Sequence, residues 1–415
     1  MKKNYSWPLF LLLFPLGVSA QPLERDTSFL TGTLKNGLTY YIRHNAKEPG
    51  IADFYIAQRV GSILEEPRQR GLAHFLEHMA FNGTAHFRGD SKSPGIVPWC
   101  ESVGVKFGAN LNAYTSVDQT VYNISAVPVG REAVLDSALL ILHDWSRSLL
   151  LTDKEIDKER GVIHEEWRMR RSGKATQRMM ERVMPIVYRG TKYEDCLPIG
   201  SMDIVDRFPY NDLRDYYKKW YRPDLQSVIV VGDIKPAEVE AKIKRLFGNI
   251  PRAKYAAERI YYPVNDNDRM IVATDRDSEQ PIMLANLYMK HDVVPDRDKS
   301  DISYLRDSYM ESLIISMLNA RLQELQQQAV PPFLSATAHA GQFLVSRTKD
   351  AFRLSFGCRQ ENVKGSFDAV IAESERARRY GFTESELRRA QERQMKVAER
   401  QYTERNDRRN RYFVT

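Results

Sequence analysis

Cysteine is scarce in this chain of 415 residues, which contains only three. The three, Cys100, Cys196 and Cys358, are an odd number and lie far apart. So few and so widely spaced cysteines exclude a small fold held together by disulfides and also a zinc ribbon, because both need several closely spaced cysteines. None of the three has the flanking residues of a papain-like nucleophile. One disulfide could form in an oxidising compartment, and the sequence does not say which two cysteines it would join.

Long apolar runs are also missing after residue 20, so we predict no integral membrane segment. The apolar run at residues 8–17 is too short to span a bilayer. It follows Lys2 and Lys3 and is followed by the small residues Val18-Ser19-Ala20, as a signal peptidase requires. Residues 1–20 are therefore predicted to be a signal peptide. We expect an exported protein, periplasmic or secreted, and a bacterial envelope fits so short a signal.

A strong charge of one sign is absent, since the formal net charge is only +7. The hydrophobic fraction of 42% and the charged fraction of 28% are those of an ordinary globular protein, which excludes a disordered chain. Much of the positive charge lies in residues 388–411, which we interpret as a solvated helix face. No aromatic platform accompanies this stretch, so no nucleic-acid partner is expected.

Helix-like and strand-like segments alternate along the mature chain. Asn36-Gly37 predicts a hairpin turn within residues 30–44. Thr152 with Glu155 forms a capping box that opens a helix. A strand is also expected at 51–60, a helix at 72–81 and a second strand at 121–127. Another helix is expected to follow that strand through about residue 150. We place a domain boundary near residue 225, which gives domains at 21–225 and 226–415.

The second part of the chain repeats this alternation less clearly. Strands are expected at 228–231, 281–288 and 351–357, and helices at 302–328 and 365–380. Residues 382–387 resemble residues 151–156, since each has a threonine cap with a glutamate three positions later. Such caps are common and give only slight support for a duplication. The second part has no paired histidines, so only the first part can hold a metal through them.

The most informative segment is His74-Phe75-Leu76-Glu77-His78. On a helix, residues at i and i+4 share a face, so both imidazoles can converge on one ion. Zinc in catalytic sites favours two nitrogens and a carboxylate and keeps a fourth position for water. Glu77 lies beside the histidines and is placed to activate that water as a general base. The segment lacks only a third ligand.

A chance origin of this pattern has to be weighed, because the chain has eight histidines. The alternative is a pair of surface histidines with a salt-bridging glutamate. The neighbours count against it, since much of the helix is apolar (Leu72, Phe75, Leu76, Met79 and Phe81). Polar side chains in such surroundings need partners.

Residues 71–84 (GLAHFLEHMAFNGT) resemble the signature of the pitrilysin or insulinase family of zinc metallopeptidases, the inverzincins. Residues 110–116 (NLNAYTS), 159–166 (ERGVIHEE) and 220–223 (WYRP) resemble three further segments of that family. The likeness covers nearly all of the mature chain. It implies two related α/β (α+β) domains, each a mixed β-sheet with helices packed on one side, as in mitochondrial processing peptidase-like metallohydrolases.

The resemblance also implies the site residues. Carried over, His74 and His78 are ligands of one Zn²⁺, Glu77 is the general base and Glu166 is the third ligand. Glu165, one position away, is the competitor, and only one of the two can face the metal because neighbours on a helix point about 100° apart. Glu159 lies seven residues before Glu166, on the same face, and matches the family's outer carboxylate that orients a ligand. This alignment favours Glu166.

Three other histidines are not expected to bind the metal: His164 is interpreted as structural, and His86 and His143 as surface or packing residues. His164 occupies a variable position of the family pattern, and His86 and His143 have no motif around them. The gap from His78 to Glu166 looks longer than is usual in the family, with the extra length in loops at residues 88–98 and 105–109.

Asn112 and Ala113 correspond by resemblance to the edge strand that pairs with substrate backbone. An ordinary turn that enters a strand is the alternative interpretation of this segment.

We therefore expect a zinc-dependent endopeptidase that hydrolyses peptides or unfolded segments, with Glu77 activating the water at the open metal position. Relatives usually need a second pair of such domains, on the same chain or on a partner subunit, to close the chamber. The chain stops after a charged helix, so we expect the front half of a longer protein or one subunit of a pair. Two alternatives remain: a non-catalytic binding subunit, and a zinc hydrolase with a non-peptide substrate.

Overall fold

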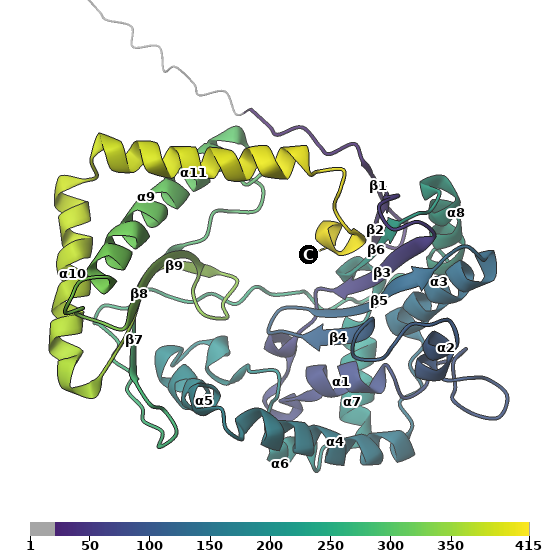
Figure 1. Cartoon of the computed structure of the whole chain (residues 1–415). Coiled ribbons are helices and arrows are strands. Elements are labelled where there is room, and N and C mark those ends of the chain that lie inside the picture. The colour runs from purple at the N-terminus through teal and green to yellow at the C-terminus, as the bar shows by residue number, and fades with distance from the viewer. Residues whose placement is uncertain (1–20, 415) are drawn as a thin grey trace, which may run out of the picture.

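The computed structural model describes residues 21–414, which form two units, each built on one β-sheet (Figure 1). The first sheet has six strands in the order β1-β2-β6-β3-β5-β4, and the second has three in the order β7-β9-β8. Helices cover both sheets, so the expected α/β class with two sheet-and-helix units is confirmed. The predicted signal peptide, residues 1–20, lies outside the described residues.

The first sheet is mixed. Its strands are β1 (Phe29–Thr33), β2 (Thr39–His44), β3 (Ile51–Gln58), β4 (Leu111–Thr115), β5 (Thr120–Pro128) and β6 (Gln226–Gly232). Strands β2 and β6 pair in parallel, and every other pairing is antiparallel. The β1–β2 hairpin turns at the predicted Asn36-Gly37, where Gly37 has a φ of 100° that favours glycine. Among the strands that the structure describes, β4 neighbours only β5 and is therefore an edge.

Helices pack against one face of this sheet. They include α3 (Glu132–Arg147), α7 (Tyr210–Trp220) and α8 (Pro236–Phe247). Alternate residues of β3 point to the helices, and Ala52, Phe54 and Ile56 are fully buried there. On α3, Trp145 stacks on Tyr122 of β5 with the ring centroids 5.3 Å apart. The aromatic contacts fix α3 on the sheet.

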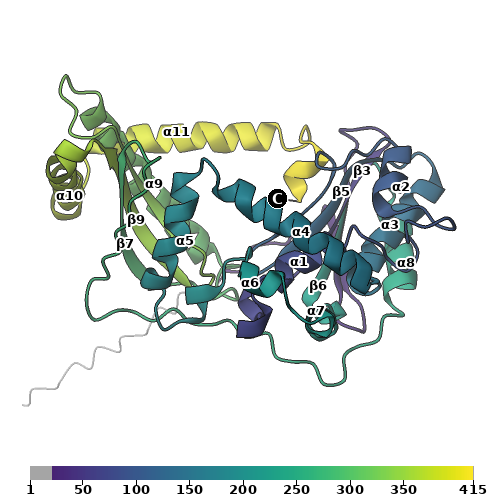
Figure 2. The ribbon, with the colours of Figure 1, turned by 90° about the horizontal axis from the view of Figure 1, so that it is seen from below.

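Two further helices carry the predicted site. Helix α1 (Leu72–Met79) is short and lies beside β4 and α7, and α4 (Asp153–Arg171) runs along it (Figure 2). Half of the predicted capping box of α4 is present, because the Thr152 hydroxyl accepts a hydrogen bond from the backbone N–H of Glu155. The reciprocal bond from the Glu155 side chain to the Thr152 N–H is not formed in the described residues. The remaining helices of this unit are α2 (Ile96–Ser102), α5 (Ala175–Val187) and α6 (Met202–Val205).

The second unit is smaller. Its strands β7 (Met283–Asp292), β8 (Ser335–Gln342) and β9 (Lys349–Cys358) are antiparallel throughout. Helices α9 (Ile302–Gln326) and α10 (Val363–Tyr380) pack against them, and α11 (Glu384–Thr403) lies on α9. Its core is small and includes Leu318, Leu322, Phe333, Leu354 and Phe356.

The two units are tied together at both ends of the described chain. Near its start, the Leu23 N–H donates to the Ser300 carbonyl over 2.7 Å. At its end, α11 runs back toward the first sheet, and the short helix η6 (Asn410–Phe413) docks there (Figure 1). Asn410 is fully buried and its side-chain oxygen accepts from the Asn45 side chain over 2.7 Å.

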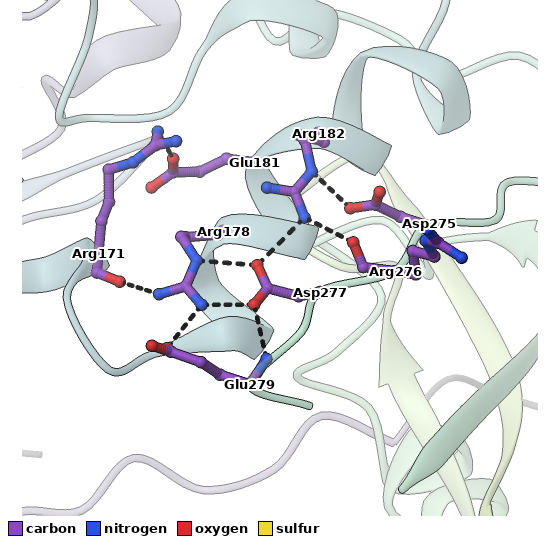
Figure 3. A network of polar contacts seen from close by, with 8 residues as sticks. All are labelled: Arg171, Arg178, Glu181, Arg182, Asp275, Arg276, Asp277 and Glu279. Atoms are coloured by element: carbon purple, nitrogen blue, oxygen red, sulfur yellow. Dashed lines mark hydrogen bonds and ion pairs between the residues drawn. The ribbon is translucent and has the colours of Figure 1, made fainter. Parts of the chain in front are cut away.

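A third tie is a polar network on α5 (Figure 3). Arg178 donates to both carboxylate oxygens of Asp277 over 2.8 and 2.5 Å, and it also contacts Glu279 over 2.8 Å. Arg182, one helical turn further, donates to Asp275 over 2.6 Å. The network fixes α5 to the stretch that leads into β7.

Several sequence-based expectations can be compared with these elements. All three cysteines are buried and unpaired. Among residues 21–414, the structure contains no helix long and apolar enough to cross a membrane. The boundary proposed near residue 225 falls just before β6, which lies inside the six-stranded sheet between β2 and β3. A division at 225 would cut β6 from its neighbours, so we now propose a boundary after α8.

Candidate metal centre and active site

Helix α1 carries both predicted histidines on one face because they are four residues apart. Leu72, Phe75 and Leu76 on its other faces are fully buried in the core. No side chain of the helix itself caps its start. The buried carboxylate of Glu65 does so instead, accepting hydrogen bonds from the N–H groups of Gly71 (3.0 Å) and Ala73 (2.7 Å). The helix is thereby held at its first turn as well as along its length.

Helix α4 brings two glutamates to these histidines. The Glu166 Oε2 lies 3.1 Å from His78 Nε2 and 3.5 Å from His74 Nε2. Glu159, two turns earlier, lies 2.8 Å from His78 Nδ1 through its Oε1 and accepts from the Asn82 side chain over 2.6 Å through its Oε2. The structure thus places Glu159 at the far nitrogen of His78, opposite Glu166.

Glu165 does not join this cluster. Its side chain is 47% exposed and pairs with Arg168 on the same helix. The expected geometry of a helix accounts for this, since neighbouring positions point in different directions. Glu166 also contacts Arg170 through its second oxygen. Of the two candidate ligands, only Glu166 lies beside His74 and His78.

Glu77 projects into the same space and accepts a hydrogen bond from the Thr115 hydroxyl at the end of β4. A cavity of about 250 Å³ opens here. Its walls come from α1, β4, α4, α5 and one loop: His74, Glu77, Ala113, Tyr114, Thr115, Trp167, Arg170, Gln177, Glu181, Leu197, Pro198 and Ile199. The acid, one of the histidines and an edge strand therefore share one cavity.

Burial and charge act differently on the two histidines. Burial lowers the pKa of His74 to about 4, so its ring is neutral at ordinary pH. Burial would also lower the pKa of His78, but its hydrogen bonds to Glu159 and Glu166 raise the pKa to about 9. Burial raises the pKa of Glu77, and the Thr115 hydroxyl opposes that shift. A proton on His78 therefore balances the carboxylates around it.

These donors fit a divalent metal ion of the zinc type. One ligand atom from each of His74, His78 and Glu166 can be chosen such that all three lie within 4.8 Å of one another. Two imidazoles with one carboxylate are a common set for catalytic zinc. A cation would also take over the charge balance that a proton on His78 supplies between the two carboxylates. The residues present therefore suit the ion that the sequence predicts.

The predicted substrate residues lie on the edge strand. Ala113 lines the cavity, and its backbone N–H is bonded to the side-chain oxygen of Asn112 (2.9 Å) and not to β5. Its main-chain donor thus points away from the sheet. Asn112 is exposed and its amide donates to the Gly108 carbonyl over 3.2 Å. The open edge of β4 borders the cavity, as an added strand would require.

Two neighbours of the site were given no role in the sequence analysis. Asn82, just after α1, contacts Glu159, and Thr115, at the end of β4, contacts Glu77. Both lie in the segments that carry the family resemblance, which was the signal that could have identified them. His164, expected to be structural, is exposed and lies 3.2 Å from Asp206.

Known proteins resemble this chain over most of its length. A family model described as Insulinase (Peptidase family M16) matches residues 51–197, and one described as Peptidase M16 inactive domain matches residues 207–394. The probable zinc protease PqqL of Escherichia coli K12 is 32% identical over 377 residues, which are 91% of this chain and 39% of that protein. The zinc protease PQQL-like of Arabidopsis thaliana is 31% identical over 80% of this chain and 34% of its own length.

Among solved structures, the periplasmic protease PqqL from Escherichia coli superposes with a TM-score of 0.82 at 29% identity. The match covers 95% of this chain and 42% of that one. The chain therefore spans less than half the length of these relatives.

Proposed function

The chain belongs to the insulinase peptidase family (M16), and on that premise we propose that it is the metal-binding part of an exported zinc endopeptidase. Its substrates are peptides or unfolded segments. The convergence of His74, His78 and Glu166 beside Glu77 carries this proposal. The names of the relatives, zinc proteases and a periplasmic protease, support it. The signal-like segment at residues 1–20 supports export.

His74, His78 and Glu166 would hold one zinc ion. When bound, zinc polarises the scissile carbonyl and makes a water acidic enough to react near neutral pH. Glu159 accepts a hydrogen bond from the Nδ1–H of His78, which fixes the tautomer and leaves Nε2, on the side of Glu166, to bind the metal. Because Asn82 holds the other oxygen of Glu159, the orienting carboxylate cannot rotate away.

Glu77 acts as the general base. It takes a proton from the water as oxygen bonds to the carbonyl carbon, and returns it to the nitrogen as the C–N bond breaks. Burial raises the pKa of Glu77, which favours this two-way transfer near neutral pH. The Thr115 hydroxyl holds the carboxylate in place.

The open edge of β4 would hold the substrate. Its backbone groups can pair with an extended peptide whatever the side chains are, which suits unfolded segments. Asn112, whose side chain now satisfies the Ala113 N–H, would give way to a substrate carbonyl. A second peptidase half, on the same chain or on a partner subunit, would then close the chamber. The coverage of only 39% of the Escherichia coli relative supports such a half.

The test compares the purified chain, with its zinc content measured, with a Glu77→Gln variant against a pool of unstructured peptides. We expect the variant to keep zinc and to lose about 10²–10⁴-fold in cleavage rate. If the zinc-loaded parent cleaves nothing, a candidate second half is added. Cleavage that appears then supports the two-part enzyme. Continued inactivity would favour a non-catalytic binding subunit or a hydrolase of non-peptide substrates.

A further inference from the structure

A second cluster of metal-binding side chains lies outside the site described above. His143 and Asp144 are neighbours near the end of α3, and His86 belongs to the loop that follows α1. The residues have no sequence motif in common. One ligand atom from each can be chosen such that all three lie within 4.8 Å of one another, the same criterion that His74, His78 and Glu166 satisfy.

The carboxylate at the centre of this cluster is held firmly. Asp144 is fully buried. Its Oδ2 accepts hydrogen bonds from the Thr84 hydroxyl (2.6 Å) and from the backbone N–H of His86 (2.9 Å). These two bonds fix the plane of the carboxylate and leave Oδ1 to the side chains. An outer set of hydrogen bonds that orients a ligand is a usual feature of protein metal sites.

Both histidines turn toward that single oxygen. The Nδ1 of His86 lies 2.8 Å from Asp144 Oδ1, and the Nδ1 of His143 lies 3.4 Å from it. The His143 ring packs edge-on against Phe247 with the centroids 5.6 Å apart, so its direction is constrained. Ligand atoms about 2.0–2.1 Å from a tetrahedral zinc ion lie roughly 3.3 Å from each other. The two distances to Oδ1 bracket this value.

The exposure of the three side chains suits a metal that enters from solvent. Asp144 is buried and the His143 side chain is 19% exposed, whereas the His86 side chain is 51% exposed. The site is therefore closed on the α3 side and open on the loop side. Two imidazoles and a carboxylate select zinc and similar divalent transition metals over magnesium or calcium, which prefer oxygen ligands.

We propose that His86, His143 and Asp144 form a second binding site for a divalent transition metal, which ties the loop after α1 to helix α3. The loop already contacts α3 and its end through Thr84 and Ala85, whose N–H donates to the Ser148 carbonyl over 2.9 Å. The metal would add a cross-link at the exposed side of the same junction. Because the cluster shares no residue with the first centre, this site does not depend on the proposed peptidase activity.

The experiment counts zinc. The full chain is stripped with a chelator and titrated with zinc in competition with a chromophoric chelator. We expect two equivalents for the parent, one for Glu166→Gln, one for His86→Ala and none for the double variant. His86→Ala leaves both bonds to Asp144 Oδ2 in place, since one comes from the His86 backbone and the other from Thr84. His291→Ala, which removes an exposed histidine of β7, is the matched control and should keep two.

The proposal is overturned if the parent binds only one equivalent of zinc, or if His86→Ala binds as many equivalents as the parent. His86 and His143 would then be only hydrogen-bonding partners of Asp144. Circular dichroism checks that each variant is folded. If His86→Ala is not, His143→Ala replaces it. Crystals soaked in zinc give an independent result, because anomalous scattering should show a peak between His86 and His143. Its absence at full occupancy of the first centre would contradict the assignment.

Discussion

The carboxylate of Glu159 should be irreplaceable even by glutamine, for a reason visible in its two contacts. One oxygen faces His78 Nδ1 at 2.8 Å and the other faces the Asn82 amide nitrogen at 2.6 Å. Both neighbours are donors when His78 binds a metal through Nε2, so both positions need an acceptor. Glutamine offers one acceptor and one donor. Glu159→Gln therefore creates a donor–donor contact on one side or the other.

The expected loss is about 10–100-fold in zinc affinity, the usual effect of losing an outer partner of a ligand histidine. This corresponds to about 1.4–2.7 kcal/mol. The assay is competition for zinc with a chromophoric chelator, with every variant made in the His86→Ala background so that only the first centre is measured. Glu165→Gln is the matched control, because that glutamate is exposed and faces away from the histidines.

A second substitution tests the reasoning itself. Asn82→Asp in the Glu159→Gln background supplies the missing acceptor, since the glutamine NH₂ can donate to Asp while its oxygen accepts from His78. The pair also keeps the same total charge. We expect the double variant to regain most of the lost affinity. Losing an outer partner of a ligand histidine normally costs at least about tenfold in zinc affinity. The explanation is therefore refuted if the zinc affinity of Glu159→Gln is within about twofold of that of the parent. It is also refuted if the double variant binds zinc more weakly than Glu159→Gln alone.

Three further predictions concern stability. Burial raises the pKa of Glu65 to about 8 from 4.5. The protonated side chain therefore contributes its full share to the free energy of unfolding below pH 4.5, and this share is lost as pH rises through 8. In urea unfolding measured across this range, the parent should lose a few kcal/mol that Glu65→Gln does not lose. Arg178→Ala should lower the Tm, and Arg178→Lys should recover only part of it, because lysine cannot make the paired contact with Asp277. Removing zinc with a chelator should destabilise His86→Ala, which keeps only the first centre, by up to about 4 kcal/mol when zinc stood at a thousand times its Kd. Thermal scans should show no such effect when Glu166→Gln is added to His86→Ala, and the full effect when Glu165→Gln is added instead.

The sequence predicted helix α1 and the shared face of its two histidines well, because both signals are local. His74 and His78 are four residues apart on a helix whose other faces are apolar, and periodicity alone places them together. Thr152 likewise marks the start of α4 through its own hydrogen bond. The β1–β2 hairpin follows from Asn36-Gly37 in the same way. Each of these predictions depends on residues within one turn or one helix.

Other elements lack such signals. Helix α5 contains Pro185, which normally argues against a helix interior, and its position depends on the ion pairs of Arg178 and Arg182 with a distant segment. Strand β8 has the sequence SATAHAGQ, in which alanine and glycine outnumber residues that favour strands. Both elements owe their form to tertiary contacts that periodicity does not reveal.

The site shows the same division. Local spacing indicated which glutamates share a face of α4, but the contacts of Asn82 and Thr115 arise from tertiary packing between separate segments of the chain. The cluster of His86 and His143 is the clearest case, since His86 and Asp144 are 58 positions apart along the chain. In the sequence, His86 and His143 are two isolated histidines with no motif around them.

The three ties between the two sheet units have a consequence for unfolding. The small core of the second unit gains support from contacts at the start of the described chain, at α5 and at η6. These contacts are distributed over the length of the chain, so neither unit can open without breaking hydrogen bonds that belong to the other. We therefore expect one cooperative unfolding transition, with hydrogen exchange in β7, β8 and β9 slowed to a rate close to that of the larger sheet.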